Sequence, residues 1–218
     1  MTILTGPSRP AASGKADSLV VFLHGYGADG ADLIGLAEPL APHLPSTRFA
    51  APNAPQRCVG SPSGYQWFPI PWLDGTPEAA ARVAAEAAFA ALDAWLDREA
   101  AETPPGRTVL VGFSQGTMMA LHVGLRRKAA VAGIVGFSGR LLDPERLGAE
   151  IVARPPVLLV HGDADPVVPF ESLGQAERAL IAAGVEVSAH AARGLGHGID
   201  PGGLGLALGF IRRVLGVG

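Results

Sequence analysis

Short runs of apolar residues alternate with longer segments in which apolar positions recur every three to four residues. The apolar runs lie at 18–23, 48–51, 108–112, 131–137, 156–160 and 185–191. Their apolar character is continuous, which is typical of parallel strands that are buried on both faces of a sheet. The intervening segments predict helices from 29 or 32 to about 43, and at about 77–102, 115–128, 170–183 and 203–215. This pattern predicts an α/β fold, with a mostly parallel sheet covered by helices on both faces.

The longest predicted helix has clear boundaries and a core face. Thr76 is expected to be its N-cap and Pro77 its first residue. Its core face is expected to contain Ala85, Phe89, Leu92 and Leu96. Neither a long linker nor an internal repeat divides the 218 residues of the chain. We therefore expect a single domain, 1–218, without room for a large cap domain.

The residues Gly112-Phe113-Ser114-Gln115-Gly116 lie where one apolar run ends and a helical segment begins. This is the strand, sharp turn and helix of a G-x-S-x-G nucleophile elbow, in which the serine hydroxyl projects from the turn. The flanking glycines are expected to remove side chains that would collide with the neighbouring strand and helix. Because the chain contains 29 glycines, the motif needs partners elsewhere before it indicates a nucleophile.

Polar residues follow the carboxyl ends of the predicted strands, where open parallel sheets bind their ligands. Among them are Ser114, the pair Asp163 and Asp165, and His197 in a glycine-rich loop after the last strand. A nucleophilic serine needs a histidine base, and the base needs a carboxylate that orients its imidazole. Of the six histidines, His197 is the best placed for this role. The order Ser, Asp, His is that of an α/β-hydrolase triad, but the residues alone do not decide between the two aspartates.

Several further motifs occur in a fixed order along the chain. They are Leu-His-Gly-Tyr-Gly-Ala-Asp-Gly at 23–30, Pro-Asn-Ala-Pro at 52–55, Gly-Phe-Ser-Gln-Gly at 112–116, His-Gly-Asp-Ala-Asp-Pro-Val-Val-Pro at 161–169 and Gly-His at 196–197. Together they resemble the phospholipase/carboxylesterase family of small serine esterases, which includes the acyl-protein thioesterases. The resemblance extends from about residue 19 to the C-terminus, and it implies an α/β-hydrolase fold.

The resemblance also assigns roles to particular residues. It implies a catalytic triad of Ser114, Asp165 and His197, since the second aspartate of the His-Gly-Asp-x-Asp-Pro string is the triad acid in that family. It implies an oxyanion hole formed by the backbone N–H groups of Tyr26 and Gln115, with the side chain of Gln115 secondary. Family members commonly have leucine where this chain has Tyr26, a difference that leaves the backbone donor in place.

A long loop at 56–75 is rich in proline, glycine and aromatic residues. Tyr65, Trp67 and Phe68 are candidates for the wall of a substrate pocket, because ligand sites are largely apolar. Alternatively, these rings form a small core beneath the loop, and the two interpretations are compatible. Family members often have aspartate where Pro69 stands, and this difference bears on the substrate range.

Composition and charge narrow the classes of partner. The formal net charge is −3, and Arg126-Arg127-Lys128 is expected to favour a helix C-terminus and solvent. Neither nucleic acid nor an anionic membrane is therefore expected as a partner. The one cysteine, Cys58, allows no internal disulfide. No segment has the character of a signal peptide or of a stable membrane insertion, so a cytoplasmic protein is expected.

No histidine or cysteine cluster has metal-ligand spacing, so neither a metal nor another cofactor is expected. The residues 25–30 do match the G-x-G-x-x-G fingerprint of dinucleotide-binding proteins. However, the acidic residue that should follow about 20 residues later is missing, because the second strand ends in Pro52-Asn53-Ala54-Pro55. The glycines fit an oxyanion loop better.

The expected activity is the hydrolysis of a small-molecule carboxylic ester through an acyl-enzyme on Ser114. Thioesters and lysophospholipids are alternative substrates, and cleavage of amides is a rival reaction. A non-catalytic binding protein of the same fold is the alternative from a different functional class. The sequence leaves the oligomeric state open, and a homodimer is compatible with it.

Overall fold

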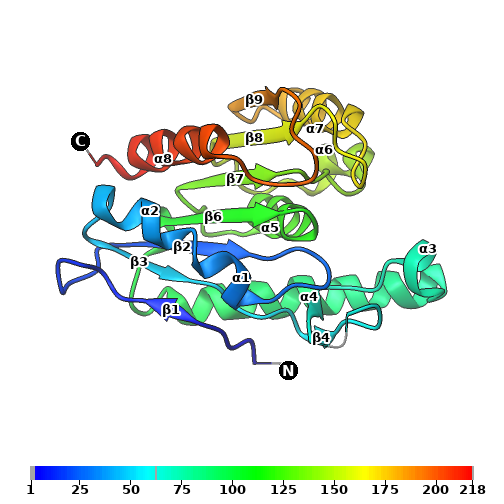
Figure 1. The fold of residues 1–218 in the computed structure, drawn as a ribbon, viewed down its shortest axis with the longest axis horizontal. Coiled ribbons are helices and arrows are strands. Elements are labelled where there is room, and N and C mark those ends of the chain that lie inside the picture. The colour runs from blue at the N-terminus through cyan, green and yellow to red at the C-terminus, as the bar shows by residue number, and fades with distance from the viewer. Residues whose placement is uncertain (1–2, 62, 218) are drawn as a thin grey trace.

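A seven-stranded sheet forms the centre of the computed structural model, which describes residues 3–61 and 63–217 (Figure 1). Its strands, in spatial order, are β1 (Ser8–Arg9), β3 (Thr47–Ala50), β2 (Ser18–Leu23), β6 (Thr108–Phe113), β7 (Gly133–Phe137), β8 (Val157–Gly162) and β9 (Val187–Ala192). β1 pairs antiparallel with β3, and the other neighbouring pairs of this sheet are parallel. The predicted α/β class with a mostly parallel sheet is confirmed.

Helices cover both faces of the sheet, as predicted. One face carries α4 (Glu78–Glu99), α5 (Gln115–Arg126) and α7 (Glu171–Ala182). The other carries α1 (Gly30–Ile34), α2 (Ala37–Leu40) and α8 (Pro201–Leu215). Successive side chains of β2 point to opposite faces, so that Leu19 and Val21 enter the first core and Val20 and Phe22 the second. Burial on both sides explains why the apolar run is continuous.

The predicted helix that ends near residue 43 is broken into shorter pieces. α1 ends at Ile34, α2 spans only Ala37–Leu40, and a 3-10 turn follows at Ala41–His43. Pro39 and Pro42 have no backbone N–H, so they cannot donate the hydrogen bonds that a continuous helix requires. The prediction of one helix here is wrong for this reason.

The boundaries of α4 are displaced slightly from those predicted. Pro77 is its N-cap, so the helix begins one residue later than predicted, and it ends at Glu99 instead of near residue 102. Phe89, Leu92 and Leu96 are buried as expected. Ala85 is only partly buried, while Trp95 is buried and completes the core face.

Arg127 departs from the expectation that the basic triplet faces solvent. It is 5% exposed, and its guanidinium binds the carboxylates of Asp93 and Asp97 on α4, the latter at 2.7 Å. Asp93 and Asp97 are four residues apart and therefore lie on the same face of α4. Arg127 thus connects the end of α5 to α4.

Short elements at the carboxyl edge of the sheet escaped the sequence pattern. They are the hairpin of β4 (Gln56–Arg57) and β5 (Tyr65–Gln66), and the one-turn helices α3 (Pro71–Asp74) and α6 (Leu147–Glu150). Each is too short for a periodic pattern to develop. Within the described ranges, no insertion at this edge forms a large cap domain. In Figure 1, β2, β6, β7 and β8 all point toward the side on which α3 lies.

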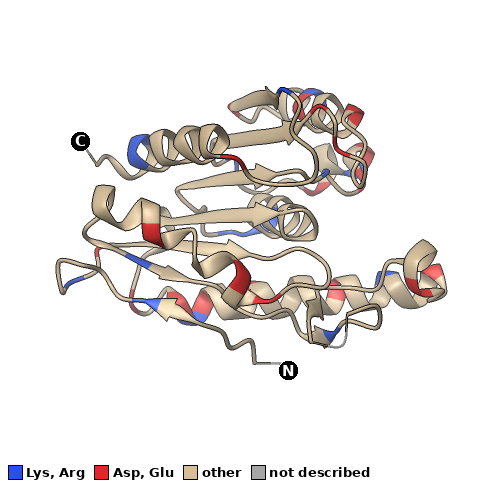
Figure 2. Cartoon of the chain, in the orientation of Figure 1, with Lys and Arg blue, Asp and Glu red and all other residues tan. Residues whose placement is uncertain are grey.

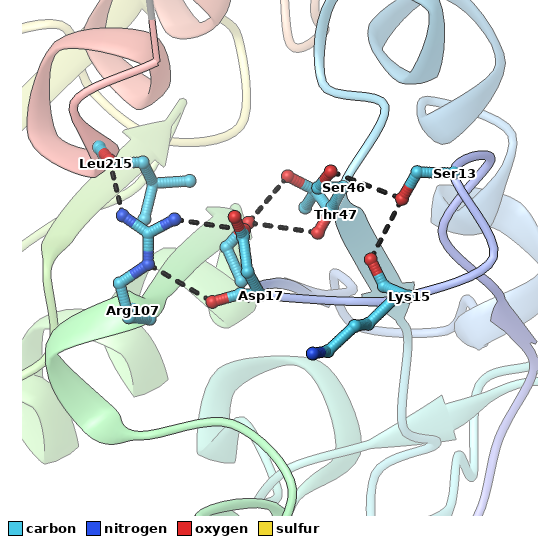
Figure 3. Close-up of polar contacts among 8 residues, drawn as sticks. Ser13, Lys15, Asp17, Ser46, Thr47, Arg107 and Leu215 are labelled. Atoms are coloured by element: carbon cyan, nitrogen blue, oxygen red, sulfur yellow. Dashed lines mark hydrogen bonds and ion pairs between the residues drawn. The ribbon is translucent and has the colours of Figure 1, made fainter.

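The opposite, amino-terminal edge of the sheet is held by polar contacts (Figure 3). Arg107 donates hydrogen bonds to the backbone oxygen of Asp17 at 3.1 Å, to its carboxylate at 2.9 Å and to the backbone oxygen of Leu215 at 2.5 Å. These contacts join the start of β6 to the residue before β2 and to the end of α8. This edge is therefore occupied by structural contacts, which leaves the carboxyl edge for a ligand site.

Charged residues of both signs are interspersed over the surface elements (Figure 2). None of the helices in the described ranges combines the length and apolar character needed to span a bilayer. Among the same residues, histidine, cysteine, aspartate and glutamate form no cluster of three with the geometry of a metal site.

Candidate active site

Ser114 occupies a strained turn between β6 and α5. Its backbone angles are φ 55° and ψ −114°, a conformation that residues with a Cβ rarely adopt. The Ser114 N–H donates a hydrogen bond to the backbone oxygen of Phe137 at 2.9 Å, which fixes the turn against β7. Such strain persists only where the surrounding structure enforces it. The turn therefore has the geometry expected of a nucleophile elbow.

The two glycines that flank Ser114 have no room for a side chain. A Cβ on Gly112 would lie 2.4 Å from the backbone oxygen of Gly116 at the start of α5. A Cβ on Gly116 would lie 1.8 Å from the backbone oxygen of Leu23 in β2. Both distances are far below van der Waals contact, which confirms the expected collisions with the neighbouring helix and strand. The motif spacing thus follows from packing.

His197 and Asp165 meet at the same edge of the sheet. His197 Nδ1 lies 2.8 Å from Asp165 Oδ2, and the imidazole packs 4.9 Å, centre to centre, from the ring of Phe113 beside Ser114. The His197 side chain is 17% exposed, while that of Asp165 is fully buried. The loops after β8 and β9 therefore bring Asp165 and His197 into contact, and His197 packs against Phe113, the residue before Ser114.

The Asp165 carboxylate is held by several donors. Its Oδ1 accepts hydrogen bonds from the backbone N–H groups of Val167 at 2.8 Å and Val168 at 3.0 Å. Its Oδ2 also lies 3.3 Å from Nε2 of the buried His161. Burial raises the pKa of Asp165, but the hydrogen bonds from His197, Val168 and Val167 outweigh it, and the net pKa is below the ordinary 3.8. The carboxylate is thus fixed in its charged form.

Asp163 has a different environment, although it lies in the same loop. It is exposed, and its Oδ1 accepts a hydrogen bond from the backbone N–H of Gly194 at 2.6 Å. Asp163 therefore stabilises the loop that carries His197 and does not contact the imidazole itself. The geometry separates two aspartates between which the residues alone did not decide.

His24 is buried at the start of the glycine-rich loop at 24–30, which follows β2. Its Nε2 accepts a hydrogen bond from the backbone N–H of Ala54 at 3.0 Å. The remaining ring nitrogen, Nδ1, must therefore carry the proton, and it donates to the Gly25 oxygen at 2.8 Å. Burial is the main cause that lowers the pKa of His24. His24 is therefore a neutral residue that holds the loop in place through its two hydrogen bonds.

The backbone N–H groups of Tyr26 and Gln115 lie beside the serine. A Cβ on Gly25, next to Tyr26, would be 3.4 Å from the Cβ of Ser114. Gln115 is the first residue of α5, where backbone N–H groups have no partner within the helix. Among the described residues, neither N–H donates a hydrogen bond to a protein acceptor. Both donors are therefore available to a ligand.

The side chain of Gln115 has a role that sequence reasoning missed. Its Oε1 accepts a hydrogen bond from the backbone N–H of Trp67 at 2.9 Å, and its Nε2 donates to the oxygen of Phe68 at 2.8 Å. Trp67 Nε1 in turn donates to the oxygen of His24 at 3.0 Å. Gln115 thus connects α5 to the loop at 56–75, called the aromatic loop below. Through Trp67 it also connects α5 to the glycine-rich loop at 24–30. These partners are distant in sequence, so no local motif indicates them.

The three predicted pocket residues have different surroundings. Trp67 is fully buried in the core between the sheet, α4 and α5, so the prediction that it lines a pocket is wrong for this residue. Its indole is instead oriented by the hydrogen bond to His24. Tyr65 is partly buried with the Arg57 guanidinium 4.2 Å above its ring. Phe68 is partly buried and lines a cleft beside α4.

Gln115→Ala is expected to lower the free energy of unfolding by about 1–3 kcal/mol, because the buried N–H of Trp67 loses its acceptor. It should also lower kcat/KM for esters about tenfold or more, because the aromatic loop is no longer fixed beside Ser114. Urea unfolding and ester hydrolysis measure the two effects. Gln175→Ala, on the exposed side of α7, is the matched control. Equal stability of the two variants would contradict the role of the amide.

Comparisons with known proteins bear on the family and the fold of the chain. A protein-family model described as Phospholipase/Carboxylesterase matches residues 10–215. Acyl-protein thioesterase 1 from Neurospora crassa is 32% identical over 203 residues, which cover 85% of this chain and 82% of that protein. Esterase YpfH from Escherichia coli is 26% identical over 211 residues, covering 96% and 86%. The crystal structure of esterase PE8 has a TM-score of 0.92 and 48% identity, covering 98% of this chain and 100% of that one. The structural likeness confirms the expected α/β-hydrolase fold.

Proposed function

Since the chain belongs to the phospholipase/carboxylesterase family, we propose that it hydrolyses carboxylic esters through an acyl-enzyme on Ser114. The observation that carries the proposal is the 2.8 Å contact between His197 Nδ1 and the buried Asp165 carboxylate, at the edge where Ser114 projects from its strained turn. A histidine oriented in this way presents Nε2 as a base. A serine at such a turn is the group that the base would activate.

The reaction has two steps. The Ser114 oxygen attacks the ester carbonyl while His197 Nε2 takes the hydroxyl proton, and the tetrahedral intermediate forms. His197 then gives the proton to the leaving alcohol, and the carbon–oxygen bond to that alcohol breaks. A water molecule, deprotonated by His197, attacks the acyl-enzyme, and the acid is released as the proton returns to Ser114. Asp165 keeps Nδ1 protonated and stabilises the imidazolium in both steps.

The backbone N–H groups of Tyr26 and Gln115 are the proposed oxyanion hole. Their support is their position beside Ser114 and their lack of protein acceptors among the described residues. Donors of this kind act on the oxygen as its charge develops, and one donor contributes about 3–4 kcal/mol to transition-state stabilisation. Because both are backbone groups, the tyrosine at position 26 leaves this chemistry unchanged.

A thioester is the second candidate substrate. It is favoured by the relative from Neurospora crassa, which is named an acyl-protein thioesterase and is 32% identical to this chain. Attack by Ser114 on a thioester needs the same base and the same oxyanion donors, with a thiol as the leaving group. The two substrates therefore differ in the leaving group and not in the proposed machinery.

A direct test compares the p-nitrophenyl ester, the thioester and the p-nitroanilide of butyric acid as substrates of the whole chain. The proposal predicts turnover of the ester, with a first-turnover burst of p-nitrophenol wherever deacylation is slower than acylation. Faster turnover of the thioester would make that the main activity. Turnover of the anilide alone would contradict the proposal and favour an amidase.

Three further expectations stay predictions. A cytoplasmic location is tested by cell fractionation, and a homodimer by analytical ultracentrifugation. Folding of residues 1–218 as one domain predicts a single cooperative unfolding transition.

A further inference from the structure

A cleft of about 170 Å³ lies at the carboxyl edge of the sheet and is lined on one side by Phe68. Its walls are the aromatic loop from 68 to 72, the side of α4 that carries Ala85 and Phe89, and the segment from 140 to 146. His122 of α5 also lines it. Apolar side chains come from all three walls, and arginine and acidic side chains come from α4 and the segment from 140 to 146.

Both walls of this cleft begin at residues that adjoin Ser114. On one side, the oxygen of Phe68 accepts a hydrogen bond from the Gln115 side chain at 2.8 Å. On the other, Gly139 precedes the segment from 140 to 146, and a Cβ on Gly139 would lie 2.8 Å from the backbone oxygen of Ser114. The cleft therefore adjoins the turn that carries Ser114.

A stacked pair of rings, Phe89 and His122, separates the cleft from a second hollow. The two rings lie 3.6 Å apart, centre to centre, with their planes 9° from parallel. The same two residues also line the second hollow, of about 170 Å³, whose other walls include Ala90 and Val123. The pair is therefore a partition with empty space on each side.

The His122 imidazole is suited to contact an apolar chain. Burial is the main cause that lowers its pKa, to about 4, so the ring is neutral at physiological pH. Its Nδ1 is buried and makes no hydrogen bond with any described residue. His122 has no part in the proposed proton transfers, since it lies two helical turns beyond Ser114 on α5.

The distance from the Ser114 turn to the partition follows from the helix. His122 is seven residues beyond Gln115, which places it about 10 Å along α5 at a rise of about 1.5 Å per residue. With carbon–carbon bonds of about 1.5 Å, an extended chain of roughly eight carbons covers this distance. Resting on the proposed esterase function, we propose that the cleft binds the acyl chain of medium-length esters and that the Phe89–His122 partition sets its upper length.

The test measures kcat/KM for p-nitrophenyl butyrate, octanoate and laurate at one detergent concentration. For the wild-type chain, kcat/KM is expected to rise from butyrate to octanoate, by up to about three- to fourfold per buried methylene. It should then fall about tenfold or more at laurate, which the partition excludes. His122→Ala opens the partition, so the laurate-to-octanoate ratio should rise at least about tenfold. His122→Phe, which rebuilds the wall, should keep the wild-type ratio.

Phe89→Leu removes the other half of the stack and should raise the same ratio, which keeps the proposal testable if His122→Ala does not fold. His190→Ala, at an exposed position on β9, is the matched control and should leave the ratio unchanged. A wild-type chain that prefers laurate, or an unchanged ratio in the folded partition variants, would overturn the inference. Failure of the proposed function has a different result: ester hydrolysis would then persist in Ser114→Ala.

Discussion

Ser114→Ala is expected to lower kcat for ester hydrolysis about 10⁴- to 10⁶-fold. Without the hydroxyl there is no nucleophile for His197 to activate and no acyl-enzyme, so only activity from the oxyanion donors and substrate binding remains. The fold should persist, because the Ser114 N–H still donates to the Phe137 oxygen and an alanine Cβ occupies the same turn. Steady-state kinetics and urea unfolding of the same preparation measure the two effects.

Ser188→Ala is the matched control for this substitution. Ser188 is an exposed serine on β9, away from the carboxyl edge, and its replacement should leave kcat unchanged. If Ser114→Ala kept near-full activity in a folded protein, the nucleophile assignment would be wrong. An unfolded Ser114→Ala protein is not expected, since the glycines at 112 and 116 that permit the turn are retained.

Asp165→Asn is expected to lower kcat about 10³- to 10⁴-fold, whereas Asp163→Asn should change it only a few-fold. An asparagine at 165 cannot stabilise the imidazolium, and its amide can donate to His197 Nδ1 and so favour the wrong tautomer. Asp163 instead accepts from the Gly194 N–H at 2.6 Å, and an asparagine oxygen can replace that contact. The two substituted residues lie two positions apart in one loop, which makes each variant the control of the other. The reverse result would move the orienting carboxylate to Asp163.

The same pair of variants should differ in acid sensitivity. The pKa of Asp165 is lowered in the fold, so its carboxylate contributes stability that is fully present above the ordinary value of 3.8. This contribution is lost as the pH falls through the lower folded value. The free energy of unfolding should therefore fall more between pH 5 and pH 3 in Asp163→Asn, which keeps Asp165, than in Asp165→Asn. An equal fall would argue against the hydrogen-bonded carboxylate.

The sheet and its two layers of helices could be predicted because continuous apolar runs record burial on both faces. The elbow could be predicted because a side chain at position 112 or 116 would collide with backbone atoms, so the turn requires glycine at both positions. Both signals are local. The breaks in the helix predicted to end near residue 43 also have a local cause, in Pro39 and Pro42, but the periodic apolar pattern concealed them.

Contacts between distant segments could not be predicted in the same way. The Gln115 side chain finds its partners at Trp67 and Phe68, and the Phe89–His122 stack joins two helices. Nothing in the neighbouring sequence marks these residues. The same local pattern is compatible with an exposed or a buried glutamine, and with an exposed or a buried histidine. The burial of Trp67 is similar, since an aromatic loop can face the core or a ligand and only the packing decides.

Ser114 is the residue that becomes acylated in the proposed reaction, and a fluorophosphonate probes this step because it phosphonylates an activated serine in place of the acyl group. Intact-mass spectrometry followed by peptide mapping is predicted to find one adduct per wild-type chain, on Ser114, and none on Ser114→Ala. Modification of a different serine, or no adduct on a protein that hydrolyses esters, would show that Ser114 is not the nucleophile.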